Sequence, residues 1–365
     1  MKERSLVIIT TRLPPQACGI GTYSWLAFAR RPENSGRAQF LVMEGAAQSR
    51  AFLNWNEVTD FDGDAAMLEQ ALNRAGPANV LLHYAGRGYQ RLGFPLWMPR
   101  ALSKWKTRFP EGRLTIFFHE VPGGLPLRSR HFLFGKLSLW TSRQLAVLAD
   151  TVVTNTEGHA AILRRLSDRD DISVLPVGSN IEPLPTASDA RVNTEFVVFG
   201  LPFGRLQTLK LFDTEIRRWQ TSGRMSALHL IGPEDERFAN RINQFAVTWP
   251  RPEVVVRHGF LSELETARLF ARARFALTNV TTGTWSKSGV FMTCAATGCG
   301  VVIKQDRTAI VPLVHAISAG ELENIPDAEL AGRVASLKAW YYKNADWNVT
   351  AKQLALLTDA GVVVS

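Results

Sequence analysis

The chain has 365 residues, of which 46% are hydrophobic, 21% charged and 10% aromatic. This length favours two domains, and the apolar fraction excludes disordered, collagen-like and low-complexity proteins. The 42 basic and 33 acidic side chains give a formal net charge of +9.

The chain start and the cysteines favour a cytoplasmic protein. The apolar run before Thr10-Thr11-Arg12 is too short for a signal-peptide core, and no apolar run approaches the ~20 residues of a membrane-spanning helix. Cys18, Cys294 and Cys299 cannot all pair and lack zinc-site spacing, which is typical of a reducing compartment.

Short apolar runs alternate with helix-period segments along the chain. In the first half we predict strands at 5–10, 39–43, 79–83, 113–118, 151–155 and 172–174, with helices at 22–30, 65–75, 101–109, 133–149 and 158–166. In the second half we predict strands at 195–199, 227–231, 253–257, 275–278 and 300–303, with helices at 206–221, 234–245, 263–273, 288–297 and 327–341. This alternation predicts parallel sheets covered by helices.

A segment without periodicity, rich in proline and small polar residues, separates the two halves. We expect an N-terminal domain over 1–180, a linker over 181–194, a C-terminal domain over 195–340 and a final helix within 341–365. The expected fold class is α/β, with two Rossmann-like doubly wound domains facing a cleft. In such sheets ligands bind beyond the carboxyl ends of the strands.

Two loops of the first half end predicted strands with residues suited to a ligand. Gly19 and Gly21 allow close backbone approach, and Thr22 is placed to cap the next helix. Ser24 stands where a dinucleotide fingerprint has its third glycine, so a plain tight turn is the alternative. His119 and Glu120 follow the strand 113–118, where a histidine either moves a proton or has a structural role.

Two loops of the second half suit an anion. Gly200 precedes Arg205 and Lys210, two cations that can neutralise a diphosphate or can be ordinary surface side chains. Residues 281–289 bring hydroxyl groups, Lys287 and a glycine to a predicted helix N-terminus, which is the strongest anion site in the sequence. The loop does not resemble a Walker motif, which disfavours a nucleoside triphosphatase.

The whole positive surplus lies between Arg87 and Arg143, where eleven basic and two acidic residues give +9. This stretch suits a nucleic acid, an anionic membrane, a phosphorylated substrate or a solvated face. The predicted helix 101–109 places Trp105 on an apolar face beside Lys104 and Arg108, which predicts contact with anionic lipid through this helix. No nucleic-acid recognition motif occurs, so no nucleic-acid partner is expected.

Five groups of short motifs occur in a fixed order, at 18–24, 118–120, 174–181, 199–210, and 258–261 with 286–289 and 296–302. Together they resemble the two-domain GT-B glycosyltransferases, in particular the large retaining group with bacterial polysaccharide mannosyl- and glucosyltransferases. The resemblance implies a UDP- or GDP-linked sugar donor in the C-terminal domain. It implies a glycan or polyprenyl-diphosphate-linked acceptor in the N-terminal domain, onto which the last helix crosses back.

The resemblance also implies roles for single residues. The donor diphosphate is expected at Arg205, Lys210, Lys287, Ser288 and Gly289. The nucleobase and ribose are expected near Gly200, Gly232, His258, Gly259, Phe260 and Leu261. The catalytic candidates are His119, which would face the transferred sugar, and Glu120. The loop expected to line the cleft is Gly19, Ile20, Gly21, Thr22 and Tyr23.

The sequence departs from this family at two glutamates eight residues apart. The second would fall at Thr293, and no acidic residue lies between Glu265 and Asp306. The pair Asp62-Gly63-Asp64 has the spacing of a metal site but precedes a helix, where acids act as caps, so we expect neither a metal nor another cofactor. The charge of the leaving diphosphate is then met by cations and helix N-termini.

The function that the resemblance implies is transfer of a sugar, with retention at the anomeric carbon, in cell-surface polysaccharide synthesis. The protein would act in the cytoplasm or peripherally on the inner face of the cell membrane. A catalytically silent relative that binds nucleotide or glycan as a complex subunit, and a nucleotide-sugar epimerase, are the alternatives.

Overall fold

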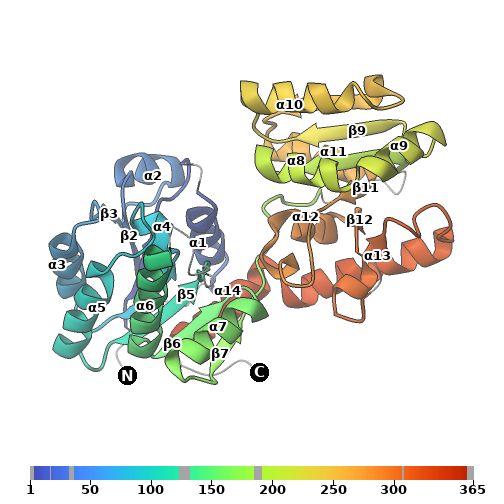
Figure 1. Ribbon diagram of the computed structural model, residues 1–365. Coiled ribbons are helices and arrows are strands. Elements are labelled where there is room, and N and C mark those ends of the chain that lie inside the picture. Colours follow the sequence, from blue (N-terminus) through green and yellow to red (C-terminus); the bar gives the residue numbers. More distant parts are fainter. Residues whose placement is uncertain are drawn as a thin grey trace. The chain divides into compact units, whose positions relative to one another are not determined.

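The computed structural model describes residues 4–16, 18–32, 37–122, 132–184, 191–305 and 308–359. The chain divides into two compact units. Unit 1 comprises Met1–Pro176 and Trp347–Ser365, and unit 2 comprises Val177–Asp346 (Figure 1). The division falls just ahead of the predicted linker, of which residues 185–190 lie outside the described part.

Unit 1 contains a seven-stranded parallel sheet in the order β3-β2-β1-β4-β5-β6-β7. The strands are β1 (Leu6–Thr10), β2 (Ala38–Val42), β3 (Val58–Asp60), β4 (Asn79–Tyr84), β5 (Arg113–Phe118), β6 (Thr151–Thr154) and β7 (Ile172–Val174). All six residues of β4 are buried, as expected for a central strand covered on both faces.

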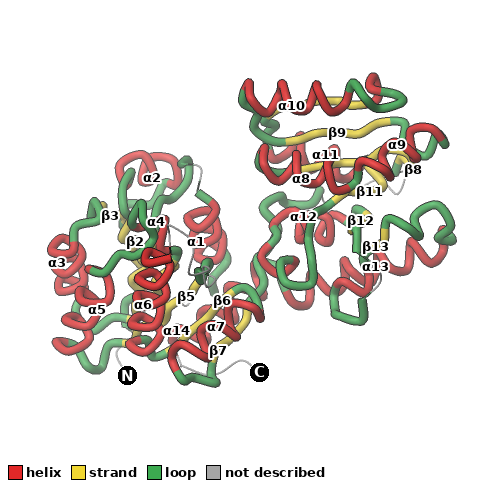
Figure 2. Tube along the Cα trace, viewed as in Figure 1, coloured by secondary structure: helices red, strands yellow, loops and turns green. Residues whose placement is uncertain are grey.

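Helices cover both faces of this sheet (Figure 2). The helices of unit 1 are α1 (Gly19–Ala29), α2 (Ala46–Leu53), α3 (Ala65–Ala75), α4 (Gly86–Tyr89), α5 (Trp97–Arg108), α6 (Phe132–Leu148), α7 (Glu157–Ser167) and α14 (Trp347–Asp359). Helices α3, α5, α6 and α7 share one apolar core, while α1 and α2 pack in another. Helix α14 packs on α1 and on strands β4 and β5.

Unit 2 contains a six-stranded parallel sheet in the order β10-β9-β8-β11-β12-β13. The strands are β8 (Val192–Phe199), β9 (Ala227–Ile231), β10 (Val255–Gly259), β11 (Ala273–Leu277), β12 (Gly300–Ile303) and β13 (Ile317–Ser318). The α-helices are α8 (Pro202–Leu211), α9 (Asp213–Thr221), α10 (Glu236–Ala246), α11 (Glu263–Arg272), α12 (Gly289–Thr297) and α13 (Asp327–Asn344). Short 3-10 turns span Pro252–Val254, Trp285–Lys287 and Leu313–His315.

The two doubly wound parallel sheets confirm the predicted fold class. The structure adds α2, α4, β3 and β13, which are too short for a periodicity argument. The single helix predicted at 206–221 is two helices, which meet at the fully buried Phe212. No helix of the described residues is long and apolar enough to cross a membrane.

Candidate functional site

In unit 2 the strand order reverses beside β8. The chain runs outward from β8 to β9 and β10, then returns to the other side of β8 as β11. At such a switch point the loops after the two central strands diverge and leave a crevice at the carboxyl edge of the sheet. We call the loops that follow β8, β9, β10 and β11 the unit 2 edge.

Three glycines join the loops of the unit 2 edge through their backbones. The Gly200 N–H donates to the Ile231 carbonyl (3.1 Å), and the Gly232 N–H donates to the Gly259 carbonyl (2.8 Å). Gly232 has a φ of +134°, and a Cβ added there would lie 2.1 Å from the Gly200 carbonyl oxygen. The structure therefore brings together Gly200, Gly232 and Gly259, and the middle position accepts only glycine without rearrangement.

The structure corrects the predicted role of Arg205 as a contact of the donor diphosphate. Its guanidinium is fully buried, donates to the carbonyl oxygens of Gly232 and Pro233, and pairs with Glu234 at 3.4 Å. Burial lowers the pKa of Arg205, while Glu234 acts in the opposite direction. A side chain without exposed surface cannot meet a ligand from solvent, so Arg205 supports the loop after β9 instead.

Exposed polar side chains lie at the switch point itself. Asn279, after β11, donates its Nδ2 to the Gln207 Oε1 of α8 at 3.4 Å. Lys210 is exposed one turn further along α8, without an ion pair among the described residues. Lys210 is therefore available to an anion, and Gln207 and Asn279 are polar neighbours that the sequence analysis missed.

Helix α12 begins against the loop after β8. A Cβ on Gly200 would lie 3.6 Å from the Val290 side chain. The Ser288 Oγ accepts from the Phe291 N–H (3.2 Å), so it caps the helix as expected for serine. The N–H groups of Gly289 and Val290 have no acceptor within the helix, and Lys287 is exposed immediately before it. This first turn has the composition of an anion site.

The segment predicted to meet a nucleobase has mixed exposure. Phe260 is 82% exposed, whereas Leu261 packs on the apolar core of unit 2. The His258 Nε2 hydrogen-bonds the His229 Nδ1 at 3.0 Å, and burial lowers the pKa values of both rings. Leu201 and Phe203, after β8, are more than two-thirds exposed and were not singled out in the sequence. The unit 2 edge thus carries exposed apolar side chains in addition to its polar groups.

Thr293, where the family's second glutamate would fall, is structural here. It is fully buried within α12, and its Oγ1 hydrogen-bonds the Ser179 Oγ at 3.1 Å. A carboxylate at this position would be buried beside a hydroxyl and an apolar core, at a large desolvation cost. Thr293 therefore occupies this position as a fully buried, hydrogen-bonded side chain.

In unit 1 the predicted catalytic histidine belongs to an aromatic cluster. The His119 ring stacks on Phe117 (centroids 4.5 Å apart) and meets Tyr23 edge-on at 4.9 Å. Tyr23 also contacts Trp347 of α14 at 5.1 Å. The cluster lies at the carboxyl end of β5, so His119 occupies the predicted edge, where it is in contact with rings from α1, β4 and β5.

Two histidines share a hydrogen bond in this cluster. The His83 Nδ1 and the His119 Nε2 are 2.9 Å apart. Burial lowers the pKa of His119 to about 3, against an opposing hydrogen bond to Asn155. Burial, followed by repulsion from His119, lowers the pKa of His83 well below its usual value. Both rings are therefore neutral at pH 7, and they can share a proton or donate a hydrogen bond but not hold a positive charge.

The predicted cleft loop has a structural role for two of its five members. A Cβ on Gly21 would overlap the Arg12 carbonyl oxygen, and Tyr23 is buried in the aromatic cluster. Thr22 lies inside α1 and is not its cap, because the helix already starts at Gly19 and Cys18 Sγ accepts from the Gly21 N–H. The accessible part of this loop is Gly19, which is exposed, with Ile20 and Thr22, which are half-buried.

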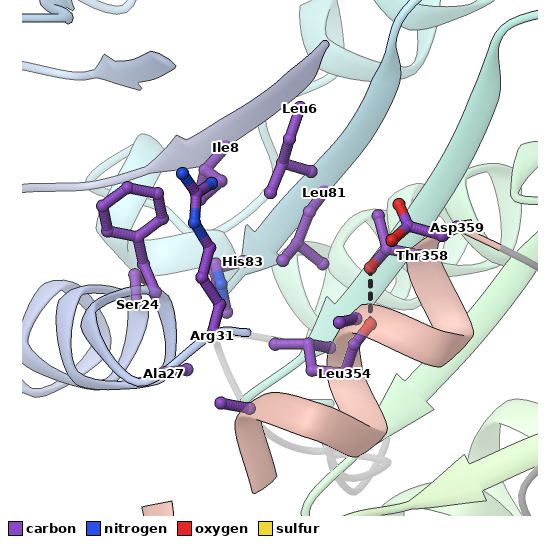
Figure 3. A pocket seen from close by; sticks show the side chains of 13 residues that line it. Leu6, Ile8, Ser24, Ala27, Arg31, Leu81, His83, Leu354, Thr358 and Asp359 are labelled. Atoms are coloured by element: carbon purple, nitrogen blue, oxygen red, sulfur yellow. Dashed lines mark hydrogen bonds between the residues drawn. The ribbon is translucent and has the colours of Figure 1, made fainter. Parts of the chain in front are cut away.

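Glu120 is exposed immediately beyond the cluster. A separate cavity of about 40 Å³ lies behind the cluster, between α1, β1, β4 and α14. Figure 3 shows His83 among its lining residues, with Thr358 and Asp359 of α14 across from it. The His83 Nε2 is buried without a protein partner, and the cavity has room for a water that would bond to it.

The apolar face of the predicted lipid-binding helix is part of the core. Ala101, Leu102 and Trp105 of α5 are almost completely buried, and α5 packs on α3. Lys104 pairs with Glu69 at 2.8 Å. Lipid contact through this face of α5 is therefore wrong, because the same residues are needed inside unit 1.

The acids considered for a metal have a local role. The Asp64 Oδ1 accepts from the N–H groups of Ala66 and Met67 at 2.6 and 3.1 Å, which confirms that it caps α3. Within the described ranges, no three His, Cys, Asp or Glu side chains gather as metal ligands would.

No protein-family model matches the amino-acid sequence, and no curated protein matches it either. Solved structures are similar over almost the whole chain. HepE from Anabaena, in complex with UDP and glucose, has a TM-score of 0.66 at 12% identity and covers 97% of this chain and 99% of its own. Sucrose-phosphate synthase from Thermosynechococcus elongatus has a TM-score of 0.64 at 14% identity, with 97% and 98% covered.

A Listeria monocytogenes protein assigned as a UDP-N-acetylglucosamine 2-epimerase has a TM-score of 0.58 at 12% identity, covering 98% of this chain and 96% of its own. At such low identity these similarities establish the fold alone. They confirm the predicted GT-B fold class, with two Rossmann-like domains.

Proposed function

We propose that this chain is a nucleotide-sugar-dependent glycosyltransferase that binds its donor at the unit 2 edge. The observation that carries the proposal is the junction of the loops after β8, β9 and β10 through Gly200, Gly232 and Gly259, beside the first turn of α12. The similarity to HepE, which was solved with UDP and glucose, supports a nucleoside diphosphate as the ligand. UDP and GDP are the candidates.

The diphosphate is assigned to Lys210, Lys287 and the first N–H groups of α12. The helix N-terminus and two cations would neutralise the negative charge that develops as the sugar–phosphate bond breaks. Ser288 contributes by holding the helix start in place. The aromatic Phe260 and the neighbouring Gly259 are assigned to the nucleobase side, where an exposed ring can stack on a base.

The acceptor is assigned to the carboxyl edge of unit 1, beside His119 and Glu120. The His119 ring, held by Phe117 and Tyr23 and hydrogen-bonded to His83, is a neutral ring at a fixed position beside which a sugar can pack. We propose a glycan or polyprenyl-diphosphate-linked acceptor, retention at the anomeric carbon, no need for a metal ion, and a role in cell-surface polysaccharide synthesis at the inner face of the membrane.

Calorimetry with UDP and GDP tests the donor site. We expect one of them to bind, and we expect Lys210→Gln and Lys287→Gln each to weaken binding roughly tenfold, the loss of about 1.4 kcal/mol of charge-assisted bonding. Lys343→Gln, an exposed lysine at the end of α13, is the matched control and should bind like the wild type. If neither nucleotide binds, or all three variants behave alike, the donor assignment is wrong.

Measurements of turnover distinguish the proposed transferase from two alternatives, a catalytically silent relative and an epimerase, each of which has its own support. Binding with slow donor hydrolysis or sugar transfer, unchanged by EDTA, supports the transferase, and NMR of the product decides between retention and inversion. Binding without turnover supports a silent relative, which the acid-free stretch from Glu265 to Asp306 favours. Conversion of the free sugar nucleotide supports an epimerase, which the Listeria structure favours.

A further inference from the structure

Helix α6 presents apolar side chains to solvent along one line. Leu133, Trp140 and Val147 are 63%, 46% and 55% exposed, and they recur every seven residues. Such spacing places them on the same side of a helix, over a length of roughly 21 Å. Lys136 and Arg143, also exposed, recur at the same interval on this side. We call these five residues the α6 stripe.

The core does not require the α6 stripe. The opposite side of α6 supplies Leu145 and Ala146, which are fully buried with Leu102 of α5 and Leu163 of α7. The inner side thus accounts for the packing of α6. The outer side keeps large apolar side chains in contact with water, which is unfavourable in free energy. A tryptophan, a leucine and a valine in one line are more than scattered surface residues.

A neighbouring loop extends the stripe. The Ser138 Oγ donates to the Gly93 carbonyl at 2.7 Å, and the rings of Phe94 and Phe134 stack 5.7 Å apart. These contacts hold the loop against the first half of α6. The loop carries Arg91, which is exposed, and Leu92, which is 49% exposed. The same combination of a cation and an apolar side chain therefore continues beyond the helix.

The charge of this surface is of one sign. Neither α5 nor α6 contains an acidic residue, and α5 adds the exposed cations Arg100 and Arg108. Asp150, just after α6, pairs with Lys106, and Glu157 of α7, which packs on α6, pairs with Arg164. A surface that combines apolar groups with an excess of cations is complementary to an anionic, amphipathic partner.

We infer that the α6 stripe, with Arg91 and Leu92, rests on a lipid bilayer with anionic headgroups. Leucine, valine and the indole of Trp140 would enter the boundary between headgroups and acyl chains, and Lys136 and Arg143 would lie among the phosphates. A linear stripe with a central tryptophan suits a flat interface, and a soluble acidic ligand would leave the apolar groups unused. The inference rests on the proposed membrane role and names the surface that performs it.

Co-sedimentation of the full chain with vesicles tests this surface. We expect binding to phosphatidylcholine vesicles that contain phosphatidylglycerol, weakened by added salt, and little binding to phosphatidylcholine alone. Lys136→Gln with Arg143→Gln should weaken binding about tenfold or more, and so should Leu133→Ser with Val147→Ser. Brominated lipid should quench wild-type fluorescence more than that of Trp140→Phe.

Matched controls lie on unit 2. Arg237→Gln with Arg241→Gln removes two exposed cations one turn apart on α10, and Val247→Ser removes an exposed apolar side chain. Both should bind vesicles like the wild type. Equal binding to neutral vesicles, or equal loss in controls and stripe variants, overturns the inference. So does a dimer in light scattering that Leu133→Ser with Val147→Ser dissociates, since a second copy would then cover the stripe. Nucleotide binding is measured without lipid, so either result leaves the donor proposal standing.

Discussion

At the scale of single residues, this fold depends on a glycine that a side chain can replace only with backbone strain. Gly232 combines a left-handed φ of +134° with a backbone oxygen 2.1 Å from where a Cβ would stand. Gly332 on α13 has neither constraint, because nothing lies within 4 Å of the position of its Cβ. Comparing the two positions therefore distinguishes a glycine that the backbone conformation requires from a helical glycine that alanine can replace.

We expect Gly232→Ala to lower the free energy of unfolding of unit 2 by about 1–3 kcal/mol, through backbone strain and displacement of Gly200. Gly332→Ala should instead raise it by up to about 1 kcal/mol, since alanine favours a helix. Urea unfolding of both variants measures these changes. A Gly232→Ala protein as stable as the wild type would show that the loops are not locked together.

The neutral state of His119 has a consequence for stability. Its pKa is about 3 when folded and near the ordinary 6.5 when unfolded. Between these values the unfolded chain binds a proton that the folded chain does not, so the free energy of unfolding rises with pH. The contribution of the neutral His119 to the free energy of unfolding is complete above pH 6.5 and is lost as the pH falls toward 3.

We expect His119→Gln to reduce the pH dependence of stability between pH 7 and 5 relative to the wild type. The difference should approach about 1.4 kcal/mol per pH unit below 6.5, and less where solvent reaches the ring. Urea unfolding at several pH values tests this sign. Parallel curves for the two proteins would mean that His119 titrates normally in the folded state.

At the scale of elements, α14 shows how a terminal helix completes a domain distant in sequence. It packs on α1, β4 and β5 of unit 1, although α13 and the preceding strands belong to unit 2. Within α14, Leu357 is fully buried while its neighbour Leu356 is 46% exposed. These adjacent leucines provide a matched pair.

We expect Leu357→Ala to destabilise unit 1 by about 2–5 kcal/mol, because it removes buried methyl groups and leaves a cavity. Leu356→Ala should change stability by less than about 0.5 kcal/mol. Calorimetry should show the transition of unit 1 at a lower temperature in Leu357→Ala and that of unit 2 unchanged. If both transitions moved together, the units would unfold as one.

At the scale of the whole molecule, the two units divide the proposed chemistry. Unit 2 has the glycine junction and the accessible lysines, and unit 1 has the aromatic cluster around His119. A ligand stabilises the domain that binds it, in proportion to the logarithm of its concentration over Kd.

We therefore expect saturating UDP or GDP to raise the melting temperature of the unit 2 transition selectively. At a hundredfold excess over Kd the stabilisation is about 2.7 kcal/mol. Leu357→Ala identifies the unit 1 transition in the same scan. A shift confined to the unit 1 transition would show that the nucleotide binds unit 1, and the assignment of the donor to unit 2 would be wrong.

The sequence by itself determined the alternation of strands and helices, since apolar runs and helical periods are local properties of the chain. It also located the loops that carry Gly200, Lys287 and His119, because those loops end apolar strands. Short strands such as β3 and β13 could not be predicted from the sequence, because they form through pairing with neighbouring strands rather than through a pattern in their own residues.

Only the tertiary structure decided which side chains are accessible. Arg205 and Trp105 have the residue types of a phosphate contact and a lipid contact, yet both are buried, and Lys210 and Trp140 remain exposed. The charge and apolarity of a side chain follow from its residue type, but its exposure depends on packing between elements far apart in the chain. That packing turns Arg205 toward carbonyl oxygens of the β9 loop and leaves the outer side of α6 in contact with solvent.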